Sequence, residues 1–369
     1  MEKKDKNLNV PNLRFPEFSG EWEKELLGTT CNVLMCKRIL ASQTNAECGV
    51  PFYKIGTIGG APDAYISKEL FESYRAKYNY PRKGEVMITC AGTVGKTMIF
   101  DGEDSYYQDS NIVWIDNPTN KIDNTFLYHL ISKVDWSKLN TTTIVRIYND
   151  DLRQLRISYP TLSEQRKISI FLNLLNQRIE TQKKIIEKYE SLIRGLCEQL
   201  TRQGTKNKAI NECLDCHAST LQESTVSGTG EYPVYGATGV CGYTNFNDVK
   251  ADGILIIKDG ASVGTTYYAR GSYSHIGTLN RLTARKGVNL RYVYYCLKVM
   301  NFAPYKTGLA IPHIYFKDYG KHRIWCPSYE EQLHIANILT QIDDKIHVEK
   351  SLLEQLNSQK RYMLNQLFI

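Results

Sequence analysis

The chain contains an internal repeat at an offset of 167 residues, and this duplication constrains its fold more than any other feature. Residues 160–165, PTLSEQ, return at 327–332 as PSYEEQ. A period this long indicates a duplicated domain, because solenoid repeats are only about 20–50 residues long. Shorter identities lie upstream: Ile147-Tyr148 with Ile314-Tyr315, Arg156-Ile157 with Arg323-Ile324, and Asp151 with Asp318.

A glycine-containing segment is also duplicated, at an offset of 169 residues. Residues 91–97, AGTVGKT, resemble residues 260–266, GASVGTT. The change of offset means that the two copies differ by small insertions and deletions. The surrounding sequence is rich in Gly, Tyr, Thr, Val and Ile, which predicts short strands bounded by glycine turns. We expect strands within 50–115 and 230–285, followed by short helices at 124–133 and 290–300.

Each copy ends in a segment that predicts a long helix. Thr161-x-x-Glu164 and Ser328-x-x-Glu331 both fit a capping box, which marks a helix start. Apolar residues then recur at alternating spacings of four and three over about five heptads, which indicates a coiled-coil seam. The alternative is that each helix packs only on its own domain. The expected pairing residues are Ile168, Leu172, Leu175, Ile179, Ile186, Ile193, Ile335, Leu339, Ile342, Ile346, Leu353 and Leu356.

These patterns together predict an α+β protein. It would contain two mixed α/β domains, each followed by a long helix, with the two helices pairing as an antiparallel coiled coil. The expected boundaries are 1–160 for the first domain, 161–204 for its helix, 205–327 for the second domain and 328–369 for its helix.

The net charge of +7 is distributed unevenly along the 369 residues. Residues 1–160 are neutral overall, whereas residues 281–327 carry nine bases and one acid. A local basic field of this kind favours phosphate-bearing partners such as DNA. The chain has no apolar run of about 18 residues and begins with a polar segment, so we expect a cytoplasmic protein without a membrane partner.

Residues 90–97 come close to a phosphate-binding loop but depart from it. The pattern G-x-x-x-x-G-K-[ST] needs a glycine where this chain has Cys90, and the second copy has Thr265 in place of Lys96. The loop should also open a helix, yet residues 98–100 continue as a strand. We interpret both segments as tight glycine turns; an ATP-binding enzyme that uses Lys96 stays as an alternative.

No other motif nominates a catalytic or metal-binding residue. Cys213-x-x-Cys216-His217 matches the attachment site of a c-type haem, but that chemistry requires export, and from the polar first residues we expect no export signal. No second C-x-x-C lies at zinc-finger spacing, and the histidines show no metal-binding spacing. We expect ordinary thiols, no metal and no catalytic residue.

One family combines these features. The chain resembles the specificity subunit of type I restriction-modification enzymes over essentially its whole length. The resemblance begins with residues 10–18, VPNLRFPEF, followed by Gly20-Glu21-Trp22. It continues with two α/β halves and a P-x-x-x-E-Q helix after each half. The resemblance implies that each globular half is a target recognition domain that reads one half of a split sequence in double-stranded DNA. The helices would hold two modification subunits, and two restriction subunits would complete an ATP-dependent nuclease.

The resemblance also implies that this subunit is not an enzyme itself. It would direct adenine methylation or restriction, while S-adenosylmethionine, ATP and Mg would bind to partner subunits. The competing interpretation is a coiled-coil scaffold whose globular domains bind proteins. From their residue types and positions, the expected DNA-binding residues are Thr93, Lys96, Arg146, Ser262, Arg281, Arg285, Lys306 and His313.

Overall fold

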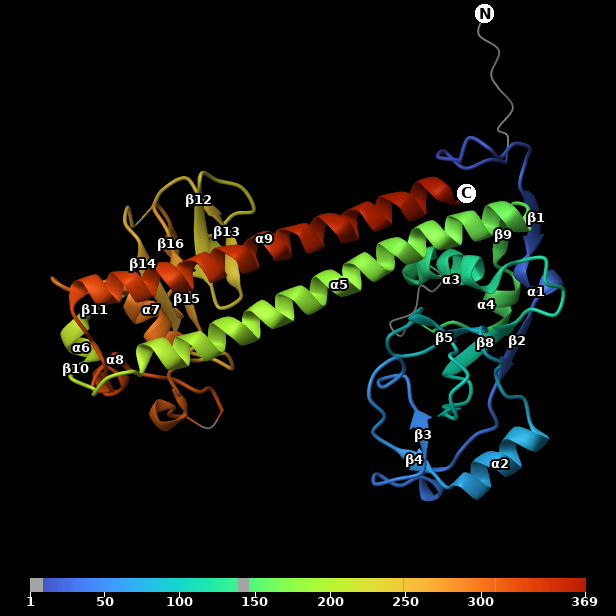
Figure 1. Ribbon diagram of the computed structural model, residues 1–369, viewed down its shortest axis with the longest axis horizontal. Coiled ribbons are helices and arrows are strands. Elements are labelled where there is room, and N and C mark those ends of the chain that lie inside the picture. Colours follow the sequence, from blue (N-terminus) through green and yellow to red (C-terminus); the bar gives the residue numbers. More distant parts are fainter. Residues whose placement is uncertain (1–8, 139–145, 248, 309) are drawn as a thin grey trace, which may run out of the picture. The chain divides into compact units, whose positions relative to one another are not determined.

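The chain divides into two compact units in the computed structural model. The structure describes residues 9–138, 146–247, 249–308 and 310–369. The first unit comprises residues 1–181 and 354–369, and the second comprises residues 182–353. Each unit therefore contains one globular part of the repeat together with a section of both long helices (Figure 1).

The first unit is built on a four-stranded antiparallel sheet with the order β2-β8-β5-β6. A three-stranded sheet, β4-β3-β7, adjoins it, in which β3 and β7 run parallel. A third pair, β1 with β9, joins the N-terminal segment to the strand that precedes the first long helix. The strands are β1 Glu23–Leu26, β2 Asn32–Met35, β3 Val50–Tyr53, β4 Tyr65–Ile66, β5 Val86–Thr89, β6 Thr97–Ile99, β7 Tyr106–Tyr107, β8 Ile112–Asp116 and β9 Arg156–Tyr159.

The second unit repeats this topology strand for strand. Its four-stranded sheet has the order β11-β17-β14-β15, its mixed sheet has the order β13-β12-β16, and β10 pairs with β18. The duplication seen in the sequence is therefore a duplication of the fold. The strands are β10 Lys208–Ala209, β11 Leu214–Ala218, β12 Tyr232–Gly236, β13 Gly239–Thr244, β14 Gly253–Ile257, β15 Thr266–Ala269, β16 Ser274–His275, β17 Leu279–Ala284 and β18 Arg323–Ile324.

Short helices pack on these sheets at equivalent places. α3, Asn124–Lys133, and α7, Leu290–Lys298, fall where the sequence predicts them. α2, Lys68–Lys77, was not predicted from the sequence and belongs to the first unit alone among the described elements. The remaining short helices are α1 Leu27–Thr30, α4 Asn149–Arg153, α6 Ile210–Cys213 and α8 Phe316–Tyr319.

The two long helices are α5, Leu162–Thr201, and α9, Tyr329–Leu367. In the first unit, Ile168 and Leu172 of α5 share a buried cluster with Leu364 and Leu367 of α9. The start of α5 therefore meets the end of α9, which makes the pair antiparallel (Figure 1).

The second unit shows the complementary part of the same pairing. Ile193 and Cys197 near the end of α5 share a buried cluster with Ile335 and Leu339 near the start of α9. Lys350 Nζ also lies 2.6 Å from Glu190 Oε1 as an ion pair between the helices. The expected fold class, two mixed α/β domains each followed by a long helix of an antiparallel pair, is thus confirmed.

The repeated P-x-x-x-E-Q motif acts through its glutamine. Gln165 Nε2 donates to the carbonyl of Pro160 at 2.8 Å, and its Oε1 accepts from the backbone N–H of Asp123, which caps α3, at 2.7 Å. In the second unit, Gln332 makes the same two bonds. They join it to Pro327 and to Asn289, the cap of α7, at 2.9 Å each. Both glutamines are buried, so each one fastens a long helix to the globular part before it.

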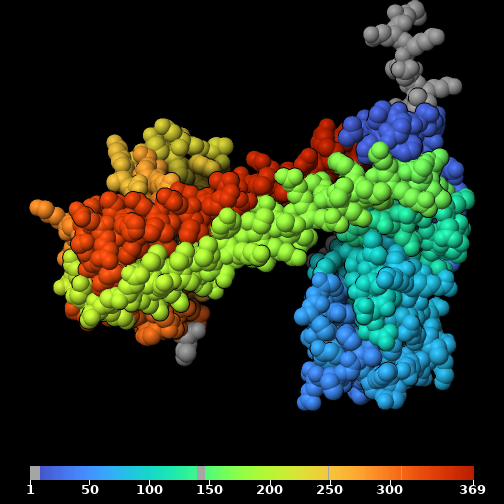
Figure 2. All heavy atoms as spheres, in the orientation of Figure 1, coloured from blue at the N-terminus to red at the C-terminus, as the bar shows by residue number. Residues whose placement is uncertain are grey.

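The capping box expected at Thr161 and Glu164 is not formed. Glu164 is 1% exposed, and its carboxylate accepts two hydrogen bonds from Arg14, at 2.8 Å from Nε and 2.7 Å from Nη2. This bidentate guanidinium–carboxylate contact is stronger than a hydrogen bond to a backbone N–H, so the Glu164 carboxylate binds Arg14 and does not cap the helix. Figure 2 shows the N-terminal residues, in dark blue, packed over the start of α5. At the second helix, Ser328 Oγ accepts from the N–H of Glu331 at 3.3 Å, which is half of the expected box.

Candidate nucleic-acid interface

A tight glycine turn connects β5 to β6 in the first unit. Its closing bond runs from the N–H of Gly95 to the carbonyl of Thr89 at 2.8 Å, and Gly95 has φ of +83°. A Cβ at this position would lie 2.2 Å from Cδ1 of Trp136. Glycine is therefore required twice, once for the left-handed backbone and once for the packing of the indole ring.

The second unit builds the same turn between β14 and β15. Gly264 has φ of +93°, and its N–H donates to the carbonyl of Ile257 at 2.9 Å. A Cβ there would lie 2.9 Å from Cβ of Phe302, so an aromatic side chain again covers the glycine. Packing and backbone conformation thus explain why the glycine occurs in both copies.

The first turn does not have the form of a phosphate-binding loop. It leads into strand β6, and a nucleotide-binding loop leads into a helix whose N–H groups hold the phosphates. The Lys96 Nζ atom, moreover, donates to the backbone carbonyl of Ile58. Lys96 therefore ties the turn to a neighbouring loop.

A second segment lies against each turn at an equivalent place. The N–H of Ile147 donates to the carbonyl of Cys90 at 2.9 Å, and the N–H of Ile314 donates to that of Lys258 at 2.9 Å. The next residue in each copy is an exposed tyrosine. Tyr148 is 59% exposed and Tyr315 is 48% exposed. The fold therefore presents a glycine turn and an exposed aromatic ring side by side in each unit.

Of the residues predicted for the first domain, Thr93 and Lys96 lie on the glycine turn and Arg146 lies just before the exposed tyrosine. Thr93 is exposed, and its carbonyl accepts a hydrogen bond from the Thr89 hydroxyl. Arg146 Nη2 lies 3.2 Å from Ser110 Oγ, and its guanidinium carbon lies 5.8 Å from the centre of the Tyr148 ring. The fold brings these three positions to one region.

Arg146 also lines a hollow of about 440 Å³ in the first unit. Arg38, Lys54, Gln108 and Asn111 line the same hollow. Guanidinium and carboxamide groups are the side chains that most often contact guanine and adenine edges, and lysine suits phosphate. Asp109 also lines the hollow, 3.7 Å from Arg38, and Lys54 pairs with Asp63 at 2.9 Å, so the lining is polar and carries charges of both signs.

The residues predicted for the second domain fall into two groups. His313 pairs with Asp259 and with Thr307 in short β-bridges, which places Ser262, Lys306 and His313 in one neighbourhood around the turn. The N–H of Gly260 also donates to the carbonyl of Pro312 at 2.9 Å. His313 Nδ1 lies 3.1 Å from Asp259 Oδ1, so its ring is oriented by a carboxylate.

Arg281 and Arg285 lie apart from this group, on or just after β17. Arg285 forms an ion pair with Asp215, with Nη2 2.8 Å from Oδ1. Arg281 lies opposite His217 in the β11–β17 ladder and lines a separate hollow of about 430 Å³.

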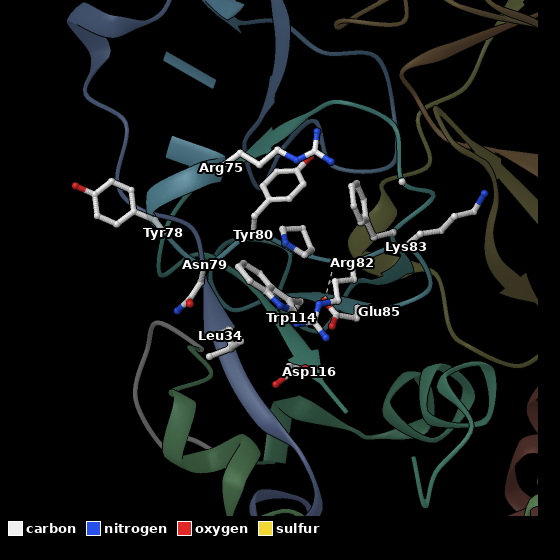
Figure 3. Close-up of a pocket in the computed structure, with 13 residues that line it drawn as sticks. Leu34, Arg75, Tyr78, Asn79, Tyr80, Arg82, Lys83, Glu85, Trp114 and Asp116 are labelled. Carbon is white, nitrogen blue, oxygen red and sulfur yellow. Dashed lines mark hydrogen bonds between the residues drawn. The ribbon is translucent and has the colours of Figure 1, made fainter. Parts of the chain in front are cut away.

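A third hollow, of about 620 Å³, lies in the first unit beside the C-terminal end of α2 (Figure 3). Arg75 extends over the ring of Tyr80, with 5.1 Å from its guanidinium carbon to the ring centre, and pairs with Asp104 at 2.9 Å. Glu85 accepts from the N–H of Arg82 at 2.7 Å, and burial raises the pKa of its carboxyl group. Arg75 and Glu85 thus hold α2 and the adjoining loop onto the sheet.

The two cysteines of the C-x-x-C-H segment are free thiols. Cys213 is buried at the end of α6, where a hydrogen bond with Cys326 and burial raise its pKa. Burial raises the pKa of Cys216 to about 11, and His217 Nε2 lies 2.9 Å from Thr283 Oγ1. Within the described ranges, no cluster of three or more His, Cys, Asp or Glu side chains is placed to hold a metal ion. No helix in those ranges is both long enough and apolar enough to span a membrane.

Of the predicted pairing residues, six lie in the buried clusters that contain residues of both α5 and α9: Ile168 and Leu172 in the first unit, and Ile193, Ile335, Leu339 and Ile346 in the second. Ile342 and Leu353 are half-buried, and the others are buried. Sequence reasoning missed the exposed tyrosines and the buried glutamines. The repeated Ile-Tyr dipeptide was a visible signal for the tyrosines, because it recurs where most neighbouring positions differ.

Comparison with known proteins gives one family over most of the chain. The model of the type I restriction modification DNA specificity domain matches twice, at residues 19–191 and 206–358. The two matches correspond to the two copies of the repeat.

Curated relatives carry related names. The Haemophilus influenzae protein S.HindORF215P, named for a type I restriction enzyme specificity subunit, is 47% identical over 174 residues, which are 47% of this chain and 42% of that protein. The MjaX specificity subunit of Methanocaldococcus jannaschii, named in the same way, is 21% identical over 411 aligned residues, which cover 98% of this chain and 96% of that protein.

Solved structures share the fold. The S subunit of a type I restriction-modification system from M. genitalium superposes with a TM-score of 0.67 at 18% identity, over 98% of this chain and 99% of that one. A chain from a study of complex assembly in the type I R-M system gives a TM-score of 0.54 at 18% identity, over 94% and 97% of the two chains. The matched part of this chain spans less than half the length of three curated relatives, at 42%, 28% and 29%.

Proposed function

The chain belongs to the family of type I restriction modification DNA specificity domains, and from this membership we propose that it is the specificity subunit of a type I restriction-modification system. In this role it reads a bipartite target in double-stranded DNA. It directs adenine methylation or ATP-dependent restriction by partner subunits and is not itself an enzyme.

One observation carries the proposal: a single chain holds two copies of one α/β topology, each followed by a long helix. Two equivalent domains suit a target with two separate half-sites. The linings of the two domains differ, with Arg38, Gln108 and Asn111 in the first and His217, His275 and Arg281 in the second. Different side chains on the same scaffold suit the reading of two different half-sites, because base edges are distinguished by hydrogen-bonding side chains.

Affinity for DNA would come largely from phosphate contacts. The strongly basic residues 281–327 would supply most of these contacts in the second domain. In the first domain, Arg146 is the main candidate for these contacts, and Arg38 and Lys54 are weaker ones because Asp109 and Asp63 already pair with them. Thr93, Ser262, Lys306 and His313 are proposed to contact DNA from the two glycine turns and their neighbours. Arg285 is a weaker candidate, since Asp215 already pairs with it.

The paired helices are the proposed attachment site for two modification subunits, one for each copy of the repeat. Two restriction subunits would join this assembly. S-adenosylmethionine, ATP and Mg would bind to the partners. The domain boundaries given above and a cytoplasmic location stay predictions.

Methylome sequencing tests the proposal. The chain is co-expressed with the modification subunits of its own system in a host that lacks adenine methylation, and a matched strain lacks only this chain. We expect methylated adenine at one bipartite motif in the first strain and none in the second. Absence of a new motif, with all subunits folded and co-purifying, would contradict the proposal.

A further inference from the structure

A short element with an exposed tyrosine occurs in both units in the same local geometry. It begins with a buried isoleucine, Ile147 or Ile314, at 2% and 1% exposure. It ends in a one-turn helix in which the N–H of Asp151 or Asp318 donates to the carbonyl of the tyrosine at 3.0 Å in both copies. Together with the bonds to Cys90 and Lys258, these contacts hold each tyrosine backbone in one position.

Folding accounts for the isoleucine in this element but not for the tyrosine ring. The isoleucines fill the cores of their domains, as their burial shows. The bonds of Tyr148 and Tyr315 described above use backbone atoms, which any residue could supply. A ring that is about half exposed adds little burial energy, because hydrophobic stabilisation scales with the area removed from water. The same large side chain at two equivalent, water-facing positions therefore indicates a contact outside the chain.

One cationic side chain lies near each ring. The guanidinium carbon of Arg146 lies 5.8 Å from the Tyr148 ring centre, and Lys317 Nζ lies 5.4 Å from that of Tyr315. The His313 ring lies 6.4 Å from the Tyr315 ring, centre to centre. An aromatic face beside a cation suits a nucleic acid, since the ring packs on a sugar or base while the cation meets a phosphate.

We propose that Tyr148 and Tyr315 are matched aromatic contacts, one for each half-site, with which the two domains pack against DNA. Each ring lies against a deoxyribose or base, and the neighbouring Arg146 or Lys317 meets an adjacent phosphate. Each element is fastened to its glycine turn, so the ring sets the position of the whole domain on its half-site. This inference rests on the proposed function.

The test uses the full chain assembled with its modification subunits and a fluorescent duplex that contains the methylated motif. The variants are Tyr148→Ala, Tyr315→Ala and the two corresponding Tyr→Phe changes. Tyr78→Ala is the matched control, because Tyr78 is 43% exposed and has Lys37 Nζ 5.5 Å from its ring centre, but follows α2 and lies outside the element described above. We expect each alanine variant to bind the duplex about tenfold more weakly, and the phenylalanine variants to stay close to wild type, because one lost aromatic–nucleic acid contact is worth about that factor.

Two further readouts separate this contact from others. Hydroxyl-radical footprinting should lose protection in one half-site for Tyr148→Ala and in the other for Tyr315→Ala. Subunit co-purification and the thermal unfolding midpoint should not change.

Unchanged duplex binding in both alanine variants would overturn the inference and leave the proposed function intact. The alanine variants could also lose their modification subunits during purification while the complex that remains binds the duplex as wild type does. That result would overturn the inference as well, and it would mean that the rings contact a protein subunit. A wild-type complex that shows no motif-dependent binding would instead refute the proposed function, and this inference with it.

Discussion

The side-chain amide of Gln182 donates a hydrogen bond to the backbone oxygen of Glu349 at 3.1 Å, and these two residues occupy equivalent positions in the repeat, 167 residues apart. The amide also donates to the Glu349 carboxylate, which Lys345 Nζ approaches at 2.6 Å. Both residues are buried in a seam of otherwise apolar residues. Equivalent residues meet because two antiparallel helices of the same design are related locally by a two-fold axis. The duplication thus explains why these two polar residues meet.

Replacing Gln182 by leucine should weaken the helix pair, because Glu349 keeps its carboxylate in the seam without the amide donor. We expect the thermal unfolding midpoint to fall by a few degrees. The double variant Gln182→Leu/Glu349→Leu should melt above wild type, since packed apolar side chains often stabilise more than a buried polar pair. Differential scanning calorimetry of the three proteins checks both statements, and a double variant less stable than the single one would contradict them.

The buried glutamine of the repeated motif should carry a measurable share of stability. Gln332→Ala leaves the N–H of Asn289 and the carbonyl of Pro327 without their partner, which costs about 1–3 kcal/mol for a buried group. Gln165→Ala should have the same effect in the first unit. Gln341→Ala is the control, because Gln341 is exposed on the same helix as Gln332. Urea denaturation provides the measurement, and equal stabilities for Gln332→Ala and Gln341→Ala would disprove the assignment.

Two nearby leucines of α5 should differ sharply in their contributions to the free energy of unfolding. Leu172 is fully buried in the cluster that joins α5 to α9, whereas Leu174 is 59% exposed. Leu172→Ala should lower the free energy of unfolding by about 2–5 kcal/mol through lost burial and a cavity. Leu174→Ala should change it by less than about 0.5 kcal/mol. Chemical denaturation of both variants tests whether the pairing seam is the face identified here.

His129 should make stability depend on pH in a mildly acidic range. The side chain is 1% exposed, its Nε2 lies 3.0 Å from Asn173 Oδ1 on α5, and burial lowers its pKa from 6.5 to about 4. Between these two pKa values the unfolded chain binds a proton on His129 that the folded chain excludes. The contribution of the neutral, buried imidazole to the free energy of unfolding is therefore fully present above pH 6.5. It is lost as the pH falls toward 4, by at most about 3 kcal/mol.

The variant His129→Gln isolates this effect from the carboxylates that titrate in the same range. Its stability should fall less steeply than that of wild type between pH 6.5 and 4. Thermal unfolding at a series of pH values gives both slopes. Parallel slopes would show that His129 does not titrate as its burial implies.

The duplicated features could be predicted from the sequence because local patterns encode them. Apolar spacing predicts α5 and α9, and glycine-bounded runs predict the strands of both units. Near the end of α5, the buried face of the helix no longer coincides with the residues that the apolar spacing marks. Continued beyond Ile193, the alternating spacings of three and four place Leu196 and Leu200 in the seam, yet Cys197 and Thr201 are the buried residues there. A straight helix drifts by about 20° per heptad against a 3.5-residue repeat, so a pattern followed over five heptads changes face.

Contacts between distant segments could not be predicted in the same way. Arg14 donates to the carboxylate of Glu164, which lies 150 residues away in the sequence, and this contact replaces the expected cap. Arg285 pairs with Asp215 only because β11 and β17 are neighbours in the sheet. Tyr148 and Tyr315 were visible as a repeat, but their exposure is a property of the folded domains. Residue type and charge nominated both Lys96 and Arg146 as DNA-binding candidates. They did not show that Lys96 donates to the backbone of Ile58 whereas Arg146 lines a hollow.

The antiparallel pair also sets an order of events during synthesis. α5 is complete at Thr201, but α9 begins only at Tyr329, so the ribosome must make the whole second globular part before the partner helix emerges. At the usual 5–20 residues per second, this interval is on the order of ten seconds. Throughout it, the part of the α5 seam beyond Ile168 and Leu172, which pack on the first globular part, lacks the helix that covers it in the finished chain and is open to a chaperone or to the same helix of a neighbouring nascent chain.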